Sequence, residues 1–402
     1  MTLKMTYKES HPWLTFKIDL RNASHTFWIL AGEAKSKCEH IASIPLKPET
    51  EAKLHAVYLV KGVRATVAIE GNTLSEDQIQ QRIEGSLTLP PSQEYLGKEI
   101  DNIITAINQI GSQVQDGHPP VLSVKLIKEF NRLVLDKLEL KEDVIPGEIR
   151  KGPFGVAHYK GAPAAECQYL LERLCEWLNG SDFPMPDDGQ EMNVITALIK
   201  AVLAHLYLEW IHPFGDGNGR TGRLLEFLIL VSSGVPSPAA HLLSNHYNLT
   251  RTEYYRQLDL STSKLKGDVR PFLEYAFRGF VDGLRAQIQL IRDQQWTVAW
   301  HNYVHEQFQD RSSQSDVRRR HLVLDLSKSN QPVPLSEIVS ISPRIAAAYA
   351  RKGPRTLSRD LNAMIKKDLI QFKENGYLTR KEKILAFLPF RHRPITKPKG
   401  KQ

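Results

Sequence analysis

Cysteine is scarce in this chain of 402 residues. The three cysteines, Cys38, Cys167 and Cys175, form no CxxC pair, which argues against a disulfide framework and against a zinc knuckle. No apolar run reaches the roughly 18 residues needed to span a bilayer, and the first ten residues lack the apolar stretch of a signal peptide. These absences predict a cytoplasmic protein with no membrane partner.

Acidic side chains are few in the last quarter of the chain. Residues 311–402 hold 21 Lys and Arg against 7 Asp and Glu, a net charge of +14, whereas residues 1–310 carry −6. This basic end predicts an acidic partner such as nucleic acid, or alternatively a solvated tail, since 391–401 alone supplies five positive charges. The length and the apolar content of 41% predict a globular protein of two or three domains.

Helical periodicity dominates the first three quarters. Residues 1–50 show no clear period, and Ser75 and Gln78 have the spacing of a capping box. Gly-Pro punctuation and short extended pieces between 145 and 163 predict a β-hairpin. Helices are predicted over about 48–71, 94–111, 121–138, 165–179, 191–210, 221–232, 252–258, 269–290 and 293–308.

A glycine-rich stretch follows the most apolar of these helices, which runs from Asn193 to Trp210. Residues 211–223 read IHPFGDGNGRTGR, with four glycines, a histidine, an aspartate and two arginines. Glycines let the backbone approach a ligand, and arginines match phosphate oxygens bidentately. An aspartate here is a candidate Mg²⁺ ligand, and a histidine can move a proton near neutral pH. The stretch predicts a phosphate-binding loop at a helix start, beside a metal site and a base.

Other interpretations of this stretch fit less well. Its GxGxxG match to a dinucleotide fingerprint requires a preceding strand, but the preceding residues have a helical pattern. A Walker A loop would end in Gly-Lys-Ser/Thr, which is missing here. His205, Glu209 and His212 have a spacing that could bind zinc on one helix face. Pro213 and the glycines would turn His212 away from that face, however.

The stretch from His212 to Arg223 resembles the HxFx(D/E)GNGRxxR signature of Fic-domain proteins, which mostly transfer AMP from ATP to a hydroxyl side chain. Residues 66–71 (TVAIEG) resemble the inhibitory motif of this family, residues 146–163 its target-docking flap, and residues 267–272 its closing helix. Together these segments cover about residues 10–290. The resemblance implies a mostly α fold, with a Fic helical core and a β-hairpin flap.

The resemblance also implies roles for single residues. His212 would be the general base that takes the proton of the attacking hydroxyl, Asp216 would hold Mg²⁺, and Phe214 would anchor the loop in the core. Backbone N–H groups at Gly217 to Gly219 and the side chain of Asn218 would form an anion hole, with Arg223 at the γ-phosphate of ATP. The nucleotide-binding residues would be Gly215, Gly217, Asn218, Gly219, Arg220, Arg223, Tyr254 and Tyr255.

Two further expectations concern regulation and base recognition. Glu70 would pair with Arg223 and keep the enzyme mostly inactive, or alternatively would position water for removal of AMP from a modified target. Tyr254 and Tyr255 resemble aromatics that flank the adenine, but Thr262 and Ser263 stand where the family has an adenine-contacting Asn. The target protein would dock on the flap at 149–159. A homo-oligomer is also expected.

The C-terminal region has a different pattern. Short helices are predicted at 317–326, 335–339 and 356–370, followed over 371–387 by two strand-like runs about Glu374-Asn375-Gly376. This is the order of a winged helix-turn-helix. Residues 355–370 would contact DNA, with Arg355, Arg359, Lys366 and Lys367 as candidates for phosphate contacts. Many winged helices bind protein or only dimerise instead.

The sequence thus predicts an autoinhibited protein adenylyltransferase that uses ATP and Mg²⁺ to modify a Ser, Thr or Tyr hydroxyl of a target protein and of itself. The alternative is a DNA-binding regulator that uses its Fic core as a nucleotide sensor. The predicted parts are an N-terminal helical region with the inhibitory motif (1–110), the Fic catalytic core (111–290), a connecting helix and linker (291–316), a winged-helix domain (317–390) and a basic tail (391–402).

Overall fold

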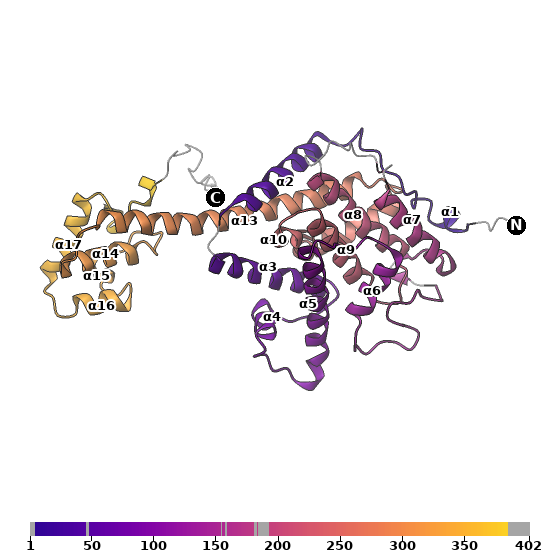
Figure 1. The fold of residues 1–402 in the computed structure, drawn as a ribbon, viewed down its shortest axis with the longest axis horizontal. Coiled ribbons are helices and arrows are strands. Elements are labelled where there is room, and N and C mark those ends of the chain that lie inside the picture. The colour runs from indigo at the N-terminus through magenta and orange to yellow at the C-terminus, as the bar shows by residue number, and fades with distance from the viewer. Residues whose placement is uncertain are drawn as a thin grey trace, which may run out of the picture. The chain divides into compact units, whose positions relative to one another are not determined.

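The computed structural model describes residues 5–45, 48–153, 155–156, 159–180, 183 and 193–384. It is mostly helical, as predicted, and it separates into two compact units, Met1–Ile288 and Gln289–Gln402 (Figure 1). The finer division into five parts stays a prediction. The predicted basic tail and the last residues of the predicted winged-helix domain, from 385 onward, lie outside the described residues.

The first unit is a helical assembly with one short hairpin. Its elements are α1 (Tyr7–Ser10), α2 (His25–Ser43), α3 (Pro48–Ala68), α4 (Glu76–Ile83), α5 (Glu94–Gln115), α6 (Val124–Val134), β1 (Gly155–Val156), β2 (Tyr159–Lys160), α7 (Cys167–Asn179), α8 (Asn193–Ile211), α9 (Asn218–Ser232), α10 (Ser237–Ala240), α11 (Leu242–Leu249), α12 (Arg251–Ser263) and the first part of α13 (Arg270–Gln307). The predicted capping box at Ser75 and Gln78 begins α4.

The centre of this unit is the pair α8 and α9, which lie side by side (Figure 1). α8 packs against α2 and α7, and α9 packs against α5 and α6, so most residues of α8 are buried as its apolar pattern predicted. The two helices approach closely at Gly222, where an added Cβ would lie 2.8 Å from His205 Nδ1. α8 is also long and apolar enough to cross a membrane, but 78% of that window is buried inside the fold, as in a core helix.

Several helices differ from the prediction. α13 is one continuous helix where the sequence predicted two segments, because the polar residues about Arg292 face solvent and do not interrupt the backbone. α9 begins at Asn218 and not at Thr221, since Gly217 adopts the left-handed conformation (φ 78°) that starts it. The helices α2, α10, α11 and α16 (Pro343–Tyr349) were not predicted.

The second unit continues from α13 through α14 (Gln314–Leu326), α15 (Leu335–Ile338), α16 and α17 (Pro354–Lys366) to β3 (Ile370–Lys373) and β4 (Gly376–Thr379). β3 and β4 pair antiparallel, and Val333 bridges to Tyr377 of β4. The turn residues Glu374 and Asn375 both have positive φ, as a two-residue type I′ hairpin requires. The unit has its own core, which includes Trp300, Phe308, Leu322, Leu326, Leu361 and Met364.

A buried carboxylate links α14 to α16. Asp325 accepts hydrogen bonds from Ser342 Oγ (2.7 Å) and from Arg344 Nε (2.7 Å), and it pairs with Lys328 Nζ (2.9 Å). Burial alone would raise the pKa of Asp325, but these partners lower it to about 2. The folded-state pKa is therefore below the ordinary value of about 3.9, so the carboxylate stabilises the fold above about pH 4 and this contribution is lost as the pH falls toward 2.

We therefore expect Asp325→Asn to lower the urea midpoint of the full-length protein at pH 7. The difference from wild type should shrink as the pH is lowered from 7 to 3, because the Asp325 carboxyl of the unfolded chain takes up a proton near pH 4 while the folded state keeps it ionised. Circular dichroism in urea at several pH values measures both effects, with the exposed Glu374→Gln as the matched control. A difference that stays constant over this pH range would contradict the assignment.

Candidate active site

The loop between α8 and α9 carries the predicted base. His212 has φ 49°, an unusual conformation for a residue other than glycine, and its N–H donates to Leu208 O at the end of α8 (2.8 Å). The side chain of Asn218 closes the loop, since its Oδ1 accepts from Phe214 N (3.0 Å) and its Nδ2 donates to Phe214 O (2.9 Å). The Phe214 ring is buried in the core, as predicted. The Asn218 side chain thus shapes the loop, and its predicted place in an anion hole stays a prediction.

The first turn of α9 follows directly. Because Gly217 precedes the helix, the N–H groups of Asn218 and Gly219 lie in its first turn, where helical N–H groups have no intrahelical acceptor. Such a helix start has a favourable potential for an anion. Gly217 N donates to Asp216 Oδ1 (2.5 Å), so one of the three N–H groups predicted for the anion hole is already engaged.

Asp216 and Arg220 form a pair beside this helix start. Arg220 is buried and donates from Nη2 to Asp216 Oδ1 (2.9 Å) and from Nη1 to Glu99 Oε1 (2.8 Å). Glu99, on α5, also accepts at Oε2 from Asn72 Nδ2 (2.8 Å). The guanidinium of Arg220 is thus fixed between two carboxylates, and Glu99 links it to the segment that follows α3.

The Glu70 carboxylate forms an ion pair with the Arg223 guanidinium, as the sequence predicted. Arg223 donates from Nη2 to Glu70 Oε1 (2.5 Å) and to Thr66 O (2.9 Å), while its Nη1 and Nε have no hydrogen-bond partner among the described residues. Burial alone would lower the pKa of Arg223, but the charge of Glu70 raises it, so the side chain stays charged. A Cβ on Gly219 would overlap Glu70 Oε1, so a larger residue at this position would make the Glu70 carboxylate shift.

Buried polar groups lie behind Arg223. His205 Nε2 is 2.8 Å from Tyr254 OH, and Tyr247 OH donates to Glu226 Oε1 (2.9 Å). Burial lowers the pKa of His205 to about 4 and raises that of Glu226 well above its ordinary value. His205 is therefore neutral at pH 7 and adds no positive charge beside Arg223, and burial favours the protonated form of Glu226.

The two tyrosines predicted to flank adenine lie in different environments. Tyr254 is buried, stacks on Tyr247 and bonds to His205, so it is part of the core. Tyr255 is exposed and donates to Ile69 O (3.3 Å), directly beside Glu70. Their adenine contacts stay predictions.

Three side chains that were not among the predicted site residues fix the geometry around the loop, although Glu209 was considered as a zinc ligand. Glu209 Oε2 is 3.6 Å from His212 Nδ1, and Arg150 Nε donates to His212 O (2.8 Å). Buried Asn131, on α6, donates to Asp216 O (2.9 Å) and accepts from Gly147 N (2.9 Å). The sequence offers one indication that Asn131 has a special role, because it is a polar residue on the apolar face of the predicted helix 121–138. For Arg150 the sequence offers only its place in the segment that resembles the flap.

The predicted flap is present as a short hairpin. β1 and β2 pair antiparallel, with Gly155 opposite Lys160 and Val156 opposite Tyr159. Its base is attached to the loop, because Ala162 N donates to Ile211 O (3.1 Å) and Tyr159 OH donates to Trp210 O (2.5 Å). Phe154, Ala157 and His158, which belong to the predicted docking segment, lie outside the described residues.

A metal ion at this site would be bound by one protein carboxylate, that of Asp216. The Asp216 side chain is 49% exposed, and its Oδ2 has no partner among the described residues. Over the same part of the chain, no three or more His, Cys, Asp or Glu side chains are grouped to hold a metal by themselves. One carboxylate fits Mg²⁺, which usually takes one or two carboxylates and completes its shell with substrate phosphates and water.

Comparison with known proteins agrees with this geometry. The model of the Fic/DOC family matches residues 121–230. The protein adenylyltransferase fic-1 of Caenorhabditis briggsae is 32% identical over 213 residues, and the protein adenylyltransferase Fic of Drosophila mojavensis is 30% identical over 211 residues. Each match covers 52% of this chain and 37% of the relative, so the chain matches little more than a third of these relatives' length.

Solved structures share the fold. A Fic family protein from Desulfovibrio desulfuricans G20 aligns with a TM-score of 0.55 at 20% identity, over 88% of this chain and 93% of its own. Residues 134–508 of Caenorhabditis elegans Fic-1 align with a TM-score of 0.54 at 24% identity, over 67% of this chain and 73% of that one. Residues 121–230 of this chain therefore match the Fic/DOC family, and the chain shares the fold of Fic proteins.

Proposed function

We propose that this protein is a protein adenylyltransferase, which transfers AMP from ATP to a side-chain hydroxyl of a target protein and of itself. The observation that carries the proposal is the placement of His212 at one end of a loop whose other end is the start of α9, with Asp216, Arg220 and Arg223 beside it. This arrangement combines a base with an anion site. The relatives named protein adenylyltransferase support the same reaction.

In this proposal His212 removes the proton of the target hydroxyl as its oxygen attacks the α-phosphorus of ATP. The bond from the α-phosphorus to the bridging oxygen breaks, and pyrophosphate leaves. The first turn of α9 binds the phosphates, and Arg220 and Arg223 offset their negative charge. Asp216 would hold Mg²⁺, which when bound would offset charge that develops on the phosphates.

Glu209 would orient the base. Burial alone would raise the pKa of Glu209, but its interaction with His212 and the charges of His212, His205 and Arg223 lower it, so the group is ionised at neutral pH. Its negative charge lies at His212 Nδ1, which favours a proton on that atom and keeps the lone pair of the imidazole on the other ring nitrogen, which would accept the proton of the hydroxyl. Glu209 is therefore a positioning residue in this proposal.

We expect Glu209→Gln to reduce kcat about tenfold and to leave KM for ATP nearly unchanged, because the amide orients the imidazole less firmly while the phosphate-binding side chains are untouched. Rates of AMP transfer at several ATP concentrations, together with the thermal midpoint of each variant, measure this. A loss of rate that follows a lowered thermal midpoint would mean that Glu209 only stabilises the fold.

We further propose that the protein is autoinhibited by the segment from Thr66 to Asn72. This segment engages both phosphate-binding arginines: Glu70 and Thr66 O bind Arg223, and Asn72 binds Glu99, which binds Arg220. With the Glu70 carboxylate on Arg223 Nη2, the γ-phosphate cannot take that position on the guanidinium, and the α-phosphate is then misaligned for in-line attack. Removal of AMP from a modified target, with Glu70 positioning water, is a second activity that the same contact allows.

The target would dock along the hairpin β1–β2 by strand addition, which presents its hydroxyl to His212. The attachment of this hairpin to Ile211 and Trp210 supports the proposal, because it fixes the docking edge beside the base. The choice among Ser, Thr and Tyr, the homo-oligomer and the cytoplasmic location stay predictions.

Incubation of the purified protein with ATP labelled at the α-phosphate and with Mg²⁺ tests the reaction. Label on protein, released as AMP by phosphodiesterase, is the expected result. ATP labelled at the γ-phosphate should give no protein-bound label. A different outcome would favour the alternative, a DNA-binding regulator that uses its Fic core as a nucleotide sensor. In that outcome wild type and Glu70→Gly both bind ATP, but neither transfers label to itself or to lysate proteins.

A further inference from the structure

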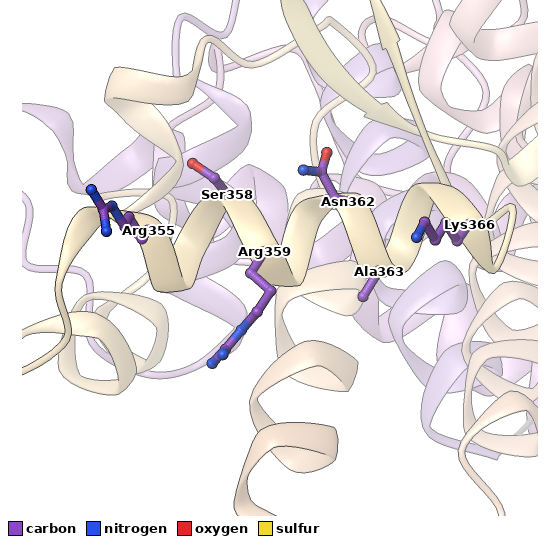
Figure 2. Close-up of a pocket in the computed structure, with 6 residues that line it drawn as sticks. All are labelled: Arg355, Ser358, Arg359, Asn362, Ala363 and Lys366. Carbon is purple, nitrogen blue, oxygen red and sulfur yellow. The ribbon is translucent and has the colours of Figure 1, made fainter.

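α17 presents one exposed polar face to solvent. The face consists of Arg355, Ser358, Arg359, Asn362, Ala363 and Lys366, which follow one another along the helix (Figure 2). All are exposed except the half-buried Ala363. Their spacing of three and four residues places them on one side of the helix, so they form a continuous surface, the α17 face.

The α17 face has positive charge and no acidic side chain. Asp360, the one acidic residue of α17, points into the core and is fully buried. It accepts from Arg318 Nε (2.8 Å), Arg319 Nε (2.7 Å) and Tyr349 OH (3.1 Å). The negative charge is therefore neutralised inside the unit, and the three cations of the face are left without an acidic neighbour on their own helix.

Burial on the opposite side fixes the orientation of α17. Leu357, Leu361 and Met364 pack in the core of the second unit, at positions that alternate with the polar ones. The bonds from Arg318 and Arg319 of α14 to Asp360 attach α17 at its centre. Rotation that would bury the polar face would expose this apolar set, so the face remains directed to solvent.

Further cations flank the face at both ends. The turn that precedes α17 holds exposed Arg351 and Lys352, and Lys373 is exposed at the end of β3, beside the hairpin turn. In a winged helix-turn-helix, the helix that follows such a turn enters the major groove, and the hairpin reaches the neighbouring backbone. The order α14, α15, α16, α17, β3, β4 corresponds to that arrangement.

We propose that the α17 face binds duplex DNA in the major groove. Arg359 and Asn362 stand at the middle of the face, and their side chains are the types that bind guanine and adenine edges bidentately. Arg355 and Lys366, at its two ends, together with Lys373, would contact phosphates. A protein partner fits less well, because the face has no aromatic or large apolar side chain to serve as the buried centre of an interface.

A selection experiment with the full-length protein tests this. A duplex library with a randomised 20-base-pair centre is enriched by binding to the immobilised protein, and the enriched duplex is then titrated by fluorescence anisotropy at several salt concentrations. Arg359→Ala should weaken binding to the enriched duplex about 5- to 100-fold and relax base preference at one position. Lys366→Ala should weaken binding to all duplexes about equally and reduce the slope of log K against log[salt] by about 1.

Two controls keep the result specific. Arg292→Ala removes the same charge from an exposed position on α13 and should leave binding near wild type. His212→Ala should bind the duplex as wild type does, because this inference does not rest on AMP transfer. The proposal is overturned if no sequence is enriched, if Arg359→Ala and Arg292→Ala bind alike, or if single-stranded RNA of the selected sequence binds more tightly than the duplex.

Discussion

Replacing His212 with alanine is expected to reduce the rate of AMP transfer by about 10²- to 10⁴-fold, the usual contribution of a general acid–base group. The structure gives the reason, because His212 directly follows α8, is fixed through its backbone by Leu208 and Arg150, and lies six residues before the start of α9. No other histidine lies in the loop 212–217. The loss should fall on kcat, since the phosphate-binding side chains are unchanged.

Transfer of α-labelled AMP and binding of ATP, both measured in the Glu70→Gly background, test this directly. His118→Ala removes an exposed histidine away from the loop and should transfer as its parent does. An affinity for ATP within a few-fold of the parent would show that the site is intact. If His212→Ala transferred AMP at the parental rate, the assignment of the base would be wrong, even if the reaction were confirmed.

Replacing Glu70 with glycine is expected to raise the rate of transfer about 10²-fold, because a misplacement of reacting atoms near 1 Å costs about that factor. In the structure the Glu70 carboxylate occupies Arg223 Nη2 and lies against Gly219, where the phosphates of ATP would have to pass. Its removal vacates the position at Arg223 Nη2 that the carboxylate occupied, while Thr66 O still holds the guanidinium. The γ-phosphate can then take the place of the carboxylate.

Single-turnover and steady-state rates of self-modification compare this variant with wild type. Glu70→Gln, which keeps the shape and loses the charge, should be activated less than Glu70→Gly. Glu76→Gln removes a carboxylate from the neighbouring helix and should have no effect. Glu70→Gly combined with Arg223→Ala should lose the gain, because the released donor is then missing. Equal rates for wild type and Glu70→Gly would refute autoinhibition by this contact.

Much of the candidate site could be predicted from residues that are close together in the sequence. The stretch from His212 to Arg223 predicted a phosphate loop, a base and a metal ligand, since the loop and the helix start that it contains are local structures. The apolar surface of α8 predicted its burial, and Ser75 and Gln78 predicted a helix start, because capping and periodicity act within one or two turns. The turn at Glu374 and Asn375 is local in the same way.

The prediction was weakest where no strong local pattern existed. The short helices α10 and α16 are stabilised by packing more than by periodicity, and the length of α13 depends on a backbone that continues through polar residues. The sequence did not predict the two hydrogen bonds between the Asn218 amide and the backbone of Phe214, which shape the loop. A side chain with several possible partners takes the one that its backbone conformation brings near.

The sequence by itself determined the chemistry of this protein: the groups that can take a proton, hold a phosphate and carry positive charge. Tertiary structure alone decided which of these groups meet. Glu70 and Arg223 are 153 positions apart, Arg220 and Glu99 are 121 apart, and Arg150 reaches His212 across 62. Such pairs depend on the packing of whole helices, because two charges interact strongly only when they are a few ångströms apart. The chain brings these residues that close only when α3, α5, α8 and α9 share one core.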